Sequence, residues 1–212
     1  MEGLQTKIKF CGLIRESDIL AANTLLPDYI GFVFAPKSRR YVTPGQAEKL
    51  KKRLDPHIQA VGVFVNETPE NIASLLNAGI IDIAQLHGQE DTAYIAHLRS
   101  LTDRILIQAF RIDRKSDVVT AQKSTADYIL LDSGDGGTGT AFDWTLLKEI
   151  DRPYFLAGGL HPGNVADAIG NLKPFAVDVS SGIESEHKKD IQKMRSFIAA
   201  VRSAEPRKEE IL

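Results

Sequence analysis

Short apolar runs of strand length alternate along the chain with longer segments in which apolar residues recur every three or four positions. The first pattern is typical of strands buried on both faces, and the second of helices that bury one side. Serine, threonine or aspartate precedes several helical segments, as expected of N-terminal caps. The predicted strands are residues 7–11, 29–34, 60–65, 80–86, 105–110, 128–131, 154–157 and 175–179, and the predicted helices are residues 17–26, 45–54, 71–77, 92–101, 116–123, 143–150, 161–172 and 188–203.

This regular alternation predicts the fold class. Strands that alternate with helices at short spacing are parallel and joined by right-handed crossovers. Eight such units in 212 residues predict an α/β fold, a single (β/α)8 TIM barrel over residues 1–212 with a frayed charged tail at 205–212. An open doubly wound sheet is the main alternative, but no Gly-x-Gly-x-x-Gly follows the first predicted strand.

Charge and composition narrow the range of partners. The 26 basic and 28 acidic residues give a net charge of −2, so any anion has to bind at a local site. No apolar run is long enough to cross a bilayer, and the N-terminus lacks the pattern of a secretion signal. The single cysteine cannot form an internal disulfide. We expect a cytoplasmic protein that binds a small molecule, with no nucleic acid and no membrane as partner.

The stretch from residue 128 to 144 is the first candidate for chemistry. Its apolar strand ends in Asp132, and the loop at 134–139 contains four glycines that allow the backbone to lie close to a ligand. A buried strand that aims an acid into a glycine loop is a common arrangement in catalytic centres. A solvated turn with a capping aspartate explains this stretch alone equally well.

Further candidates follow the last two predicted strands, and in a (β/α)8 barrel the loops after all strands meet at one face. Backbone N–H groups of Gly158 and Gly159, together with those of Ser180 and Ser181, predict a phosphate site there. Asp178 alternates with Ser180 along its strand and should therefore face the barrel interior. It would contact either sugar hydroxyls or neighbouring structural groups.

The remaining candidates are single side chains. Cys11 alone would be a small buried residue, but a thiolate opposite the Asp132 acid would form a base and acid pair for moving protons on adjacent atoms. Arg40, in a basic loop, could bind a carboxylate through two hydrogen bonds or simply be solvated. His87 could line the same pocket or be a core histidine. No cluster of histidine, cysteine and carboxylate has metal-ligand spacing, so no metal site is predicted.

Taken together, these residues resemble the phosphoribosylanthranilate isomerase family of tryptophan biosynthesis. The resemblance covers roughly residues 7–199, and it is specific because many short motifs occur in the family's order. The motifs are KFCGL (9–13), GFVF (31–34), PKSRRY (36–41), GVFVN (62–66), QLHG (85–88), LLDS (130–133), FDW (142–144), GGL (158–160) and DVSSG (178–182).

The resemblance implies an Amadori rearrangement of N-(5-phosphoribosyl)anthranilate to the 1-deoxyribulose 5-phosphate product, with no cofactor and no metal. Asp132 would protonate the furanose ring oxygen, and Cys11 would then remove the C2 proton. Arg40 would hold the anthranilate carboxylate, the turns at 158–159 and 180–181 the phosphate, and Asp178 a ribose hydroxyl. His87 is expected among the substrate-binding residues, and the protein is expected to be a monomer or homodimer.

Two departures from the family pattern are Thr140, where many relatives have lysine, and Ala157, where serine is frequent. The first puts any role for a loop cation in doubt. The sister isomerase of histidine biosynthesis and bifunctional relatives use an aspartate where this chain has Cys11, and a ribulose-phosphate epimerase would carry metal-binding histidines. A non-catalytic binder of phosphate ligands, or a structural subunit of a pathway complex, would bind without turnover and tolerate Cys11→Ala.

Overall fold

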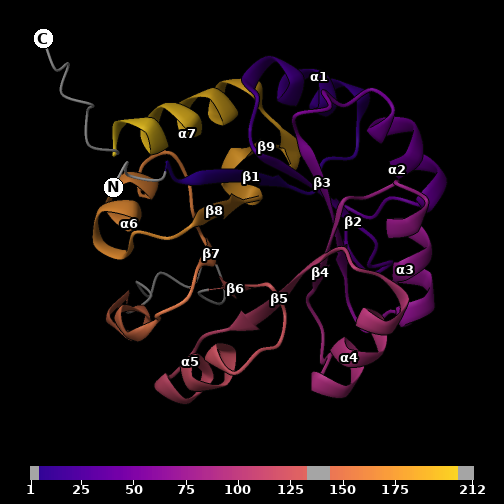
Figure 1. Cartoon of the computed structure of the whole chain (residues 1–212). Helices are drawn as coiled ribbons and strands as arrows, with labels where there is room; N and C mark the ends of the chain where they lie inside the picture. Colours follow the sequence, from indigo (N-terminus) through magenta and orange to yellow (C-terminus); the bar gives the residue numbers. More distant parts are fainter. Residues whose placement is uncertain (1–4, 133–143, 205–212) are drawn as a thin grey trace, which may run out of the picture.

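The computed structural model describes residues 5–132 and 144–204, in which eight parallel strands close into a barrel (Figure 1). Each strand pairs with the next along the chain, and β1 pairs with β8 to complete the ring. The predicted (β/α)8 barrel is confirmed, and the open sheet is excluded. The strands are β1 (Lys7–Cys11), β2 (Tyr29–Val33), β3 (Gln59–Phe64), β4 (Ile83–Leu86), β5 (Ile105–Arg111), β6 (Tyr128–Asp132), β7 (Tyr154–Ala157) and β8 (Ala176–Val179).

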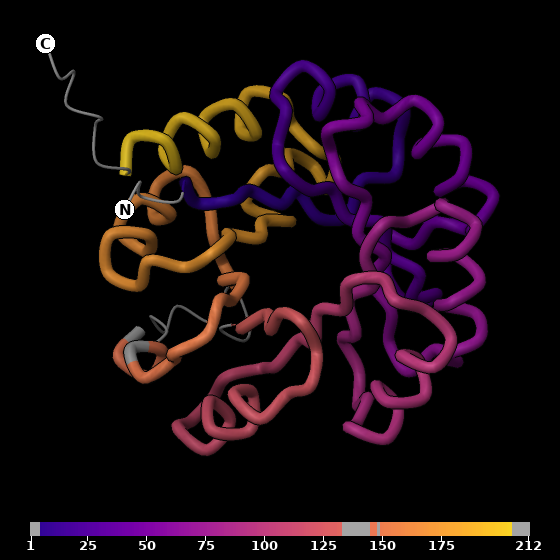
Figure 2. Tube along the Cα trace, viewed as in Figure 1, coloured from indigo at the N-terminus to yellow at the C-terminus, as the bar shows by residue number. Residues whose placement is uncertain are grey.

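Helices surround this ring of strands, and the trace returns at its end to lie beside its beginning, with α7 next to α1 (Figure 2). A short antiparallel hairpin of β9 (Glu184–Ser185) and β10 (Lys188–Lys189) precedes the last helix. No helix in the described ranges is long and apolar enough to cross a membrane. The helices are α1 (Glu16–Leu25), α2 (Pro44–Lys51), α3 (Pro69–Asn77), α4 (Thr92–Leu101), α5 (Lys115–Gln122), α6 (Val165–Leu172) and α7 (Ile191–Ser203), with 3₁₀ helices η1 (Trp144–Glu149) and η2 (Ser181–Ile183).

The alternation of side chains along each strand separates two parts of the core. On β1, Ile8 and Phe10 pack outward, and the Phe10 ring meets Phe197 of α7 edge to face at 6.3 Å between centroids. Inside the barrel, aromatic and aliphatic side chains fill the end where the strands begin, for example Tyr29 against Phe155 at 5.5 Å. The opposite end of the interior is left for polar groups.

Most predicted element bounds differ from the structure by a few residues, and two of these errors have a clear cause. Helix α6 begins at Val165 and not at 161, because the Asn164 side chain accepts a hydrogen bond from the His161 backbone at 2.8 Å and forms a turn there. The predicted helix start at 188 is also wrong. Asp190 caps α7, and positive φ angles at Glu186 (49°) and His187 (62°) turn the preceding residues into the hairpin.

Several predictions fall outside the described residues. These are the glycine loop at 134–139, Thr140, the start of a helix at residue 143 and the charged tail at 205–212. The described part of the predicted helix at 143–150 is the 3₁₀ helix η1.

Candidate active site

All nine site residues predicted from the sequence line one cavity of about 420 Å³ at the end of the barrel where the strands finish. They come from β1, β4, β6, β7, β8 and the loop after β2, so segments distant in the sequence share one wall. The nine are Cys11, Arg40, His87, Asp132, Gly158, Gly159, Asp178, Ser180 and Ser181.

Cys11 is the last residue of β1, and its half-buried thiol lies on the interior face. Its partner in the register with β2 is Gly31, where an added Cβ would be 2.8 Å from the Cys11 sulfur. A glycine is therefore needed beside this thiol. Burial raises the pKa of Cys11, while the positive charges of Lys9 and Lys189 act in the opposite direction.

Lys9 and Asp178 form a buried ion pair below this thiol, deeper in the barrel. The Lys9 ammonium lies 3.0 and 3.1 Å from the two carboxylate oxygens of Asp178, and the side chains are 0% and 9% exposed. Burial lowers the pKa of Lys9, but the charges of Asp178 and Cys11 and the hydrogen bonds to both side chains together outweigh that effect, and the pKa is raised. Asp178 lines the cavity as predicted, and it also has the structural partner that the sequence left open.

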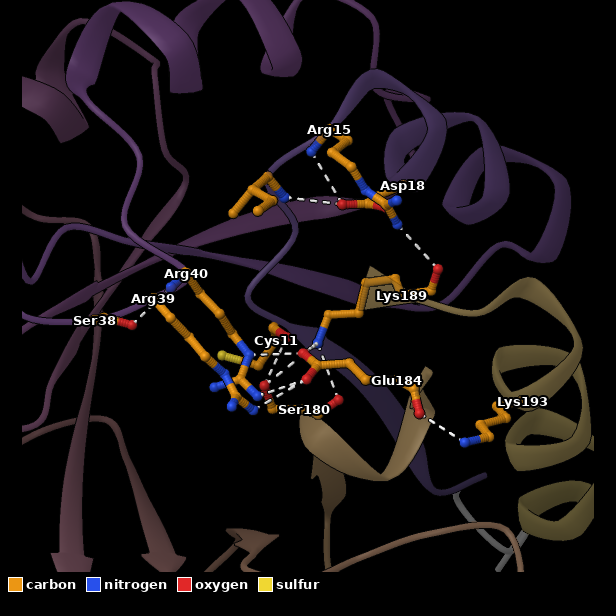
Figure 3. Close-up of polar contacts among 11 residues, drawn as sticks. Cys11, Arg15, Asp18, Ser38, Arg39, Arg40, Ser180, Glu184, Lys189 and Lys193 are labelled. Atoms are coloured by element: carbon orange, nitrogen blue, oxygen red, sulfur yellow. Dashed lines mark hydrogen bonds and ion pairs between the residues drawn. The ribbon is translucent and has the colours of Figure 1, made fainter. Parts of the chain in front are cut away.

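A cluster of four charged side chains includes Arg40, which lines the cavity (Figure 3). The Arg40 guanidinium donates to both carboxylate oxygens of Glu184, at 2.7 and 2.8 Å, and Arg39 and Lys189 contact the same carboxylate at 3.3 and 2.7 Å. Although burial opposes it, hydrogen bonds from Arg40 and Lys189 lower the pKa of Glu184 to about 2. Glu184 is thus ionised at any ordinary pH, and it holds Arg40 in one orientation.

Ser180 connects this cluster to β1. Its hydroxyl donates to the Cys11 carbonyl at 3.1 Å, and the Lys189 ammonium donates to the Ser180 carbonyl at 2.9 Å. Lys189 itself has a side chain only 2% exposed. The turn after β8 is thereby attached to the strand that carries the thiol.

The two turns predicted to bind phosphate lie in direct contact. Gly158 and Gly159 have φ angles of 92° and 61°, which a residue with a side chain rarely adopts. An added Cβ at Gly182 would lie 1.9 Å from the Leu160 carbonyl oxygen, so the turn after β8 packs against the turn after β7. Glycines at these positions allow backbone N–H groups from both turns to approach one ligand.

Asp132 and His87 face each other on the opposite wall. Asp132 is the last residue of β6, and its carboxylate oxygen is 3.9 Å from His87 Nε2. His87 Nδ1 lies 3.0 Å from the side-chain amide of Gln85, so Gln85 and Asp132 flank the two ring nitrogens. Among the described residues, no group of three or more metal-ligating side chains is arranged to hold a metal ion.

Sequence reasoning missed three charged residues of this site, namely Lys9, Glu184 and Lys189. The sequence did contain a sign of Lys9, because it alternates with Cys11 and so shares the interior face of that strand. No comparable sign existed for Glu184 and Lys189, since the hairpin was not predicted and the strand that carries Lys189 was taken as the start of a helix.

Comparisons with known proteins agree with this geometry. A family model described as N-(5'phosphoribosyl)anthranilate (PRA) isomerase matches residues 8–200. The N-(5'-phosphoribosyl)anthranilate isomerase of Endomicrobium trichonymphae is 42% identical over 201 residues, which cover 93% of this chain and 98% of the relative.

Two solved structures are similar over nearly the whole barrel. The phosphoribosyl anthranilate isomerase of Thermotoga maritima superposes with a TM-score of 0.86 at 36% identity, covering 93% of this chain and 99% of that one. A phosphoribosyl anthranilate isomerase in complex with reduced 1-(o-carboxyphenylamino)-1-deoxyribulose 5-phosphate gives a TM-score of 0.83 at 35% identity, with the same coverage. The chain therefore belongs to the N-(5'-phosphoribosyl)anthranilate isomerase family.

Proposed function

We propose that Cys11 and Asp132 carry out the proton transfers by which this chain, as a member of its family, isomerises N-(5'-phosphoribosyl)anthranilate in tryptophan biosynthesis. One observation carries the proposal. A thiol, a carboxyl group, an oriented arginine and two glycine turns, each predicted separately from the sequence, line a single cavity. This set matches the chemical groups of a substrate with a carboxylate at one end and a phosphate at the other.

The two anionic ends of the substrate fit two different parts of the wall. Arg40 would bind the anthranilate carboxylate, since its two bonds to Glu184 use only two of the five N–H donors of a guanidinium. The turns at Gly158-Gly159 and Ser180-Ser181 would bind the phosphate. Binding at both ends would orient the sugar between base and acid without touching the reacting carbons.

The reaction then needs two directed proton transfers. Asp132 gives a proton to the ring oxygen as the C1–O bond breaks, and the nitrogen lone pair forms the C1=N bond of an open Schiff base. The Cys11 thiolate takes the proton from C2, the C2–H electrons form C1=C2, and the nitrogen regains its lone pair. The resulting enolamine tautomerises to the ketone, 1-(2-carboxyphenylamino)-1-deoxyribulose 5-phosphate. Each step is acid–base chemistry that side chains supply without a cofactor.

His87 and Asp178 complete the proposed binding residues. His87 Nε2 lies on the side of the cavity occupied by Asp132 and would bind a substrate oxygen there. Asp178 would accept from a ribose hydroxyl while it remains paired with Lys9. A cytoplasmic location is part of the proposal, because a reducing compartment keeps the Cys11 thiol from oxidation. The oligomeric state, monomer or homodimer, stays a prediction. Light scattering of the purified protein would measure it.

The test is the loss of fluorescence of freshly prepared phosphoribosylanthranilate after the purified protein is added. We expect rapid loss with the parent and at least a hundredfold slower loss with Cys11→Ala and with Asp132→Asn, since general acid or base catalysis contributes about 10² to 10⁴ in rate. Asp113→Asn is a matched control, because Asp113 is exposed and paired with Arg111 outside the cavity.

Three outcomes would contradict the proposal. Unchanged turnover after Cys11→Ala or Asp132→Asn would remove the residue concerned from the mechanism. Tight binding of the substrate without turnover by the parent would favour a binding protein, and turnover of the aminoaldose of histidine biosynthesis alone would favour the sister isomerase. Circular dichroism of each variant shows whether the barrel is retained.

A further inference from the structure

Lys9 is a buried charged group to which the mechanism above gives no task. Its side chain is 0% exposed and lies in the barrel interior, where the neighbouring inward positions are largely apolar. Burying an ammonium in such a place is unfavourable unless a partner compensates for it, and Asp178 supplies that partner through two hydrogen bonds. A buried ion pair of this kind contributes little to the net free energy of folding, so stability alone does not explain why the lysine is there.

The geometry of β1 places the Lys9 charge next to the thiol. Lys9 and Cys11 are separated by one residue, so both side chains point to the interior, about 7 Å apart along the strand. The Lys9 side chain is long enough to cover that separation. The positive charge of the Lys9 ammonium acts to lower the pKa of Cys11. The negative charge of the thiolate in turn acts to raise the pKa of Lys9.

We propose that Lys9 is a positioning residue whose ammonium, held by Asp178 across the β1–β8 seam, stabilises the thiolate form of Cys11 that removes the substrate proton. This inference rests on the proposed role of Cys11 as the base. It assigns to Lys9 a part in the reaction that does not involve contact with the substrate.

The charge balance of the cavity supports this assignment. The groups that face the thiol are Lys9 on β1, Asp178 on β8, Lys189 on β10 and Arg40 in the loop after β2. Lys189 and Arg40 both pair with the Glu184 carboxylate. Lys9 pairs with Asp178 instead, and it is the cation nearest to Cys11 along β1. When the thiolate accepts the C2 proton, its negative charge disappears, and Lys9 and Asp178 remain as a neutral pair.

The reactivity of the thiol toward iodoacetamide measures this effect without substrate. The chain contains one cysteine, so the rate of alkylation as a function of pH reports on Cys11 alone. Because only the thiolate reacts, the midpoint of the rate profile gives its ionisation. A change of one pKa unit alters the rate about tenfold at pH values below the midpoint.

Four variants separate electrostatics from structure. Asp178→Asn removes a negative charge near the thiol and should move the midpoint to lower pH. Lys9→Met should move it to higher pH, with alkylation at pH 7 slowed about tenfold. Lys9→Met combined with Asp178→Asn leaves no unpaired buried charge, so it should fold even if Lys9→Met alone does not. Lys7→Met is the matched control, because Lys7 points to the same face of β1 but pairs with Asp28 at 2.8 Å.

The decisive comparison is the double variant against Asp178→Asn. A midpoint at higher pH in the double variant, with Lys7→Met unchanged, supports the proposal. Equal midpoints, or a shift in the same direction for Lys9→Met and Asp178→Asn, would overturn it and assign Lys9 to structure alone. These outcomes do not depend on turnover. If the parent shows the expected alkylation profile but does not isomerise phosphoribosylanthranilate, the proposed function fails while the pairing of Lys9 with the thiol stands.

Discussion

Arg40 reaches the cavity by a restricted route. Its stem passes so close to Gly12 that an added Cβ there would be 2.2 Å from Arg40 Cδ, and its guanidinium then meets Glu184. Gly12 also has a φ of 79°, which favours glycine. At the scale of single residues, the position of the arginine therefore depends on a glycine and a carboxylate that do not themselves line the cavity.

Glu184→Gln should weaken substrate binding more than it slows the chemistry. The amide keeps the shape of the side chain but has one acceptor oxygen in place of two, so Arg40 loses its fixed direction. We expect KM to rise about tenfold, equivalent to about 1.4 kcal/mol, with a smaller change in kcat. Steady-state kinetics measure this effect. Glu48→Gln, which alters an exposed pair with Lys52, is the control, and an unchanged KM for Glu184→Gln would show that Arg40 is held by other contacts.

The ionisation of Cys11 gives kcat/KM a defined dependence on pH. Because burial raises the pKa of this thiol, the free enzyme carries mostly the protonated form at neutral pH. A base has to be deprotonated, so the residual kcat/KM of Asp132→Asn, in which the acid no longer titrates, should rise as pH rises from 6 through 9, and fall toward lower pH. A pH profile of initial rates below KM measures this. A plateau that already begins below pH 7 would contradict the raised thiol pKa.

At the scale of elements, the contact between the turns after β7 and β8 is the feature most sensitive to a single methyl group. Gly182→Ala would place a Cβ against the Leu160 carbonyl, and the backbone would have to move apart. We expect a loss of about 1 to 3 kcal/mol in the free energy of unfolding and weaker binding of inorganic phosphate as a competitive inhibitor.

Gly170→Ala is the comparison for that variant. Gly170 lies in the neighbouring helix α6, and an added Cβ there would meet nothing within 4 Å. Since alanine is favoured over glycine in a helix, stability should rise by about 0.5 to 1 kcal/mol with phosphate inhibition unchanged. Urea unfolding curves give both values. If Gly182→Ala and Gly170→Ala lowered the free energy of unfolding equally, the contact of Gly182 with Leu160 would not be the cause.

The elements show what could be predicted from the sequence and what could not. Strands such as β6 and β7 were recognisable because a strand buried on both faces needs a run of apolar residues with little else. Helix α4 has the predicted bounds, since Asp91 caps it in the usual way. The hairpin of β9 and β10 was missed, because its turn is formed by Glu186 and His187 at positive φ, where neither residue is expected.

The candidate site divides in the same way. Residues at strand ends were predicted, because the topology alone brings those ends to one face of a barrel. The pairs Lys9 with Asp178 and Arg40 with Glu184 join positions 169 and 144 residues apart, and nothing local in the sequence specifies such partners. The sequence could therefore predict which side chains lie at the site. It could not predict which neighbouring side chains they pair with, and the structure was needed for that.

At the scale of the whole molecule, the site lies on the seam where the two ends of the chain meet. β1 supplies Cys11 and Lys9, β8 supplies Asp178, and Ser180 bonds to the Cys11 carbonyl across the junction. Near the termini, Arg202 of α7 donates to the Thr6 carbonyl at 2.8 Å. The described residues near the two ends are thus close together, and the site requires the barrel to be closed.

A circular permutation tests this arrangement. Joining the termini by a short glycine linker and opening the chain at Asp103, between α4 and β5, should leave turnover within about threefold of the parent, because that loop lies far from the cavity lining. Opening the chain instead between Ser180 and Ser181 should retain the circular dichroism of the barrel but raise KM at least tenfold, since it interrupts the phosphate turn. Equal kinetics in both permutants would contradict the assignment of that turn.

The position of the seam also has a consequence for how the protein is made. The ribosome releases Lys9, and the thiol two residues after it, long before the carboxylate partner of that lysine, which follows Lys9 by 169 residues. At about 5 to 20 residues per second, that delay lasts on the order of ten seconds or more. During this interval the only cysteine and its lysine are carried on an open sheet without the Asp178 carboxylate. Catalytic competence therefore arrives in one step, when the eighth strand docks against the first.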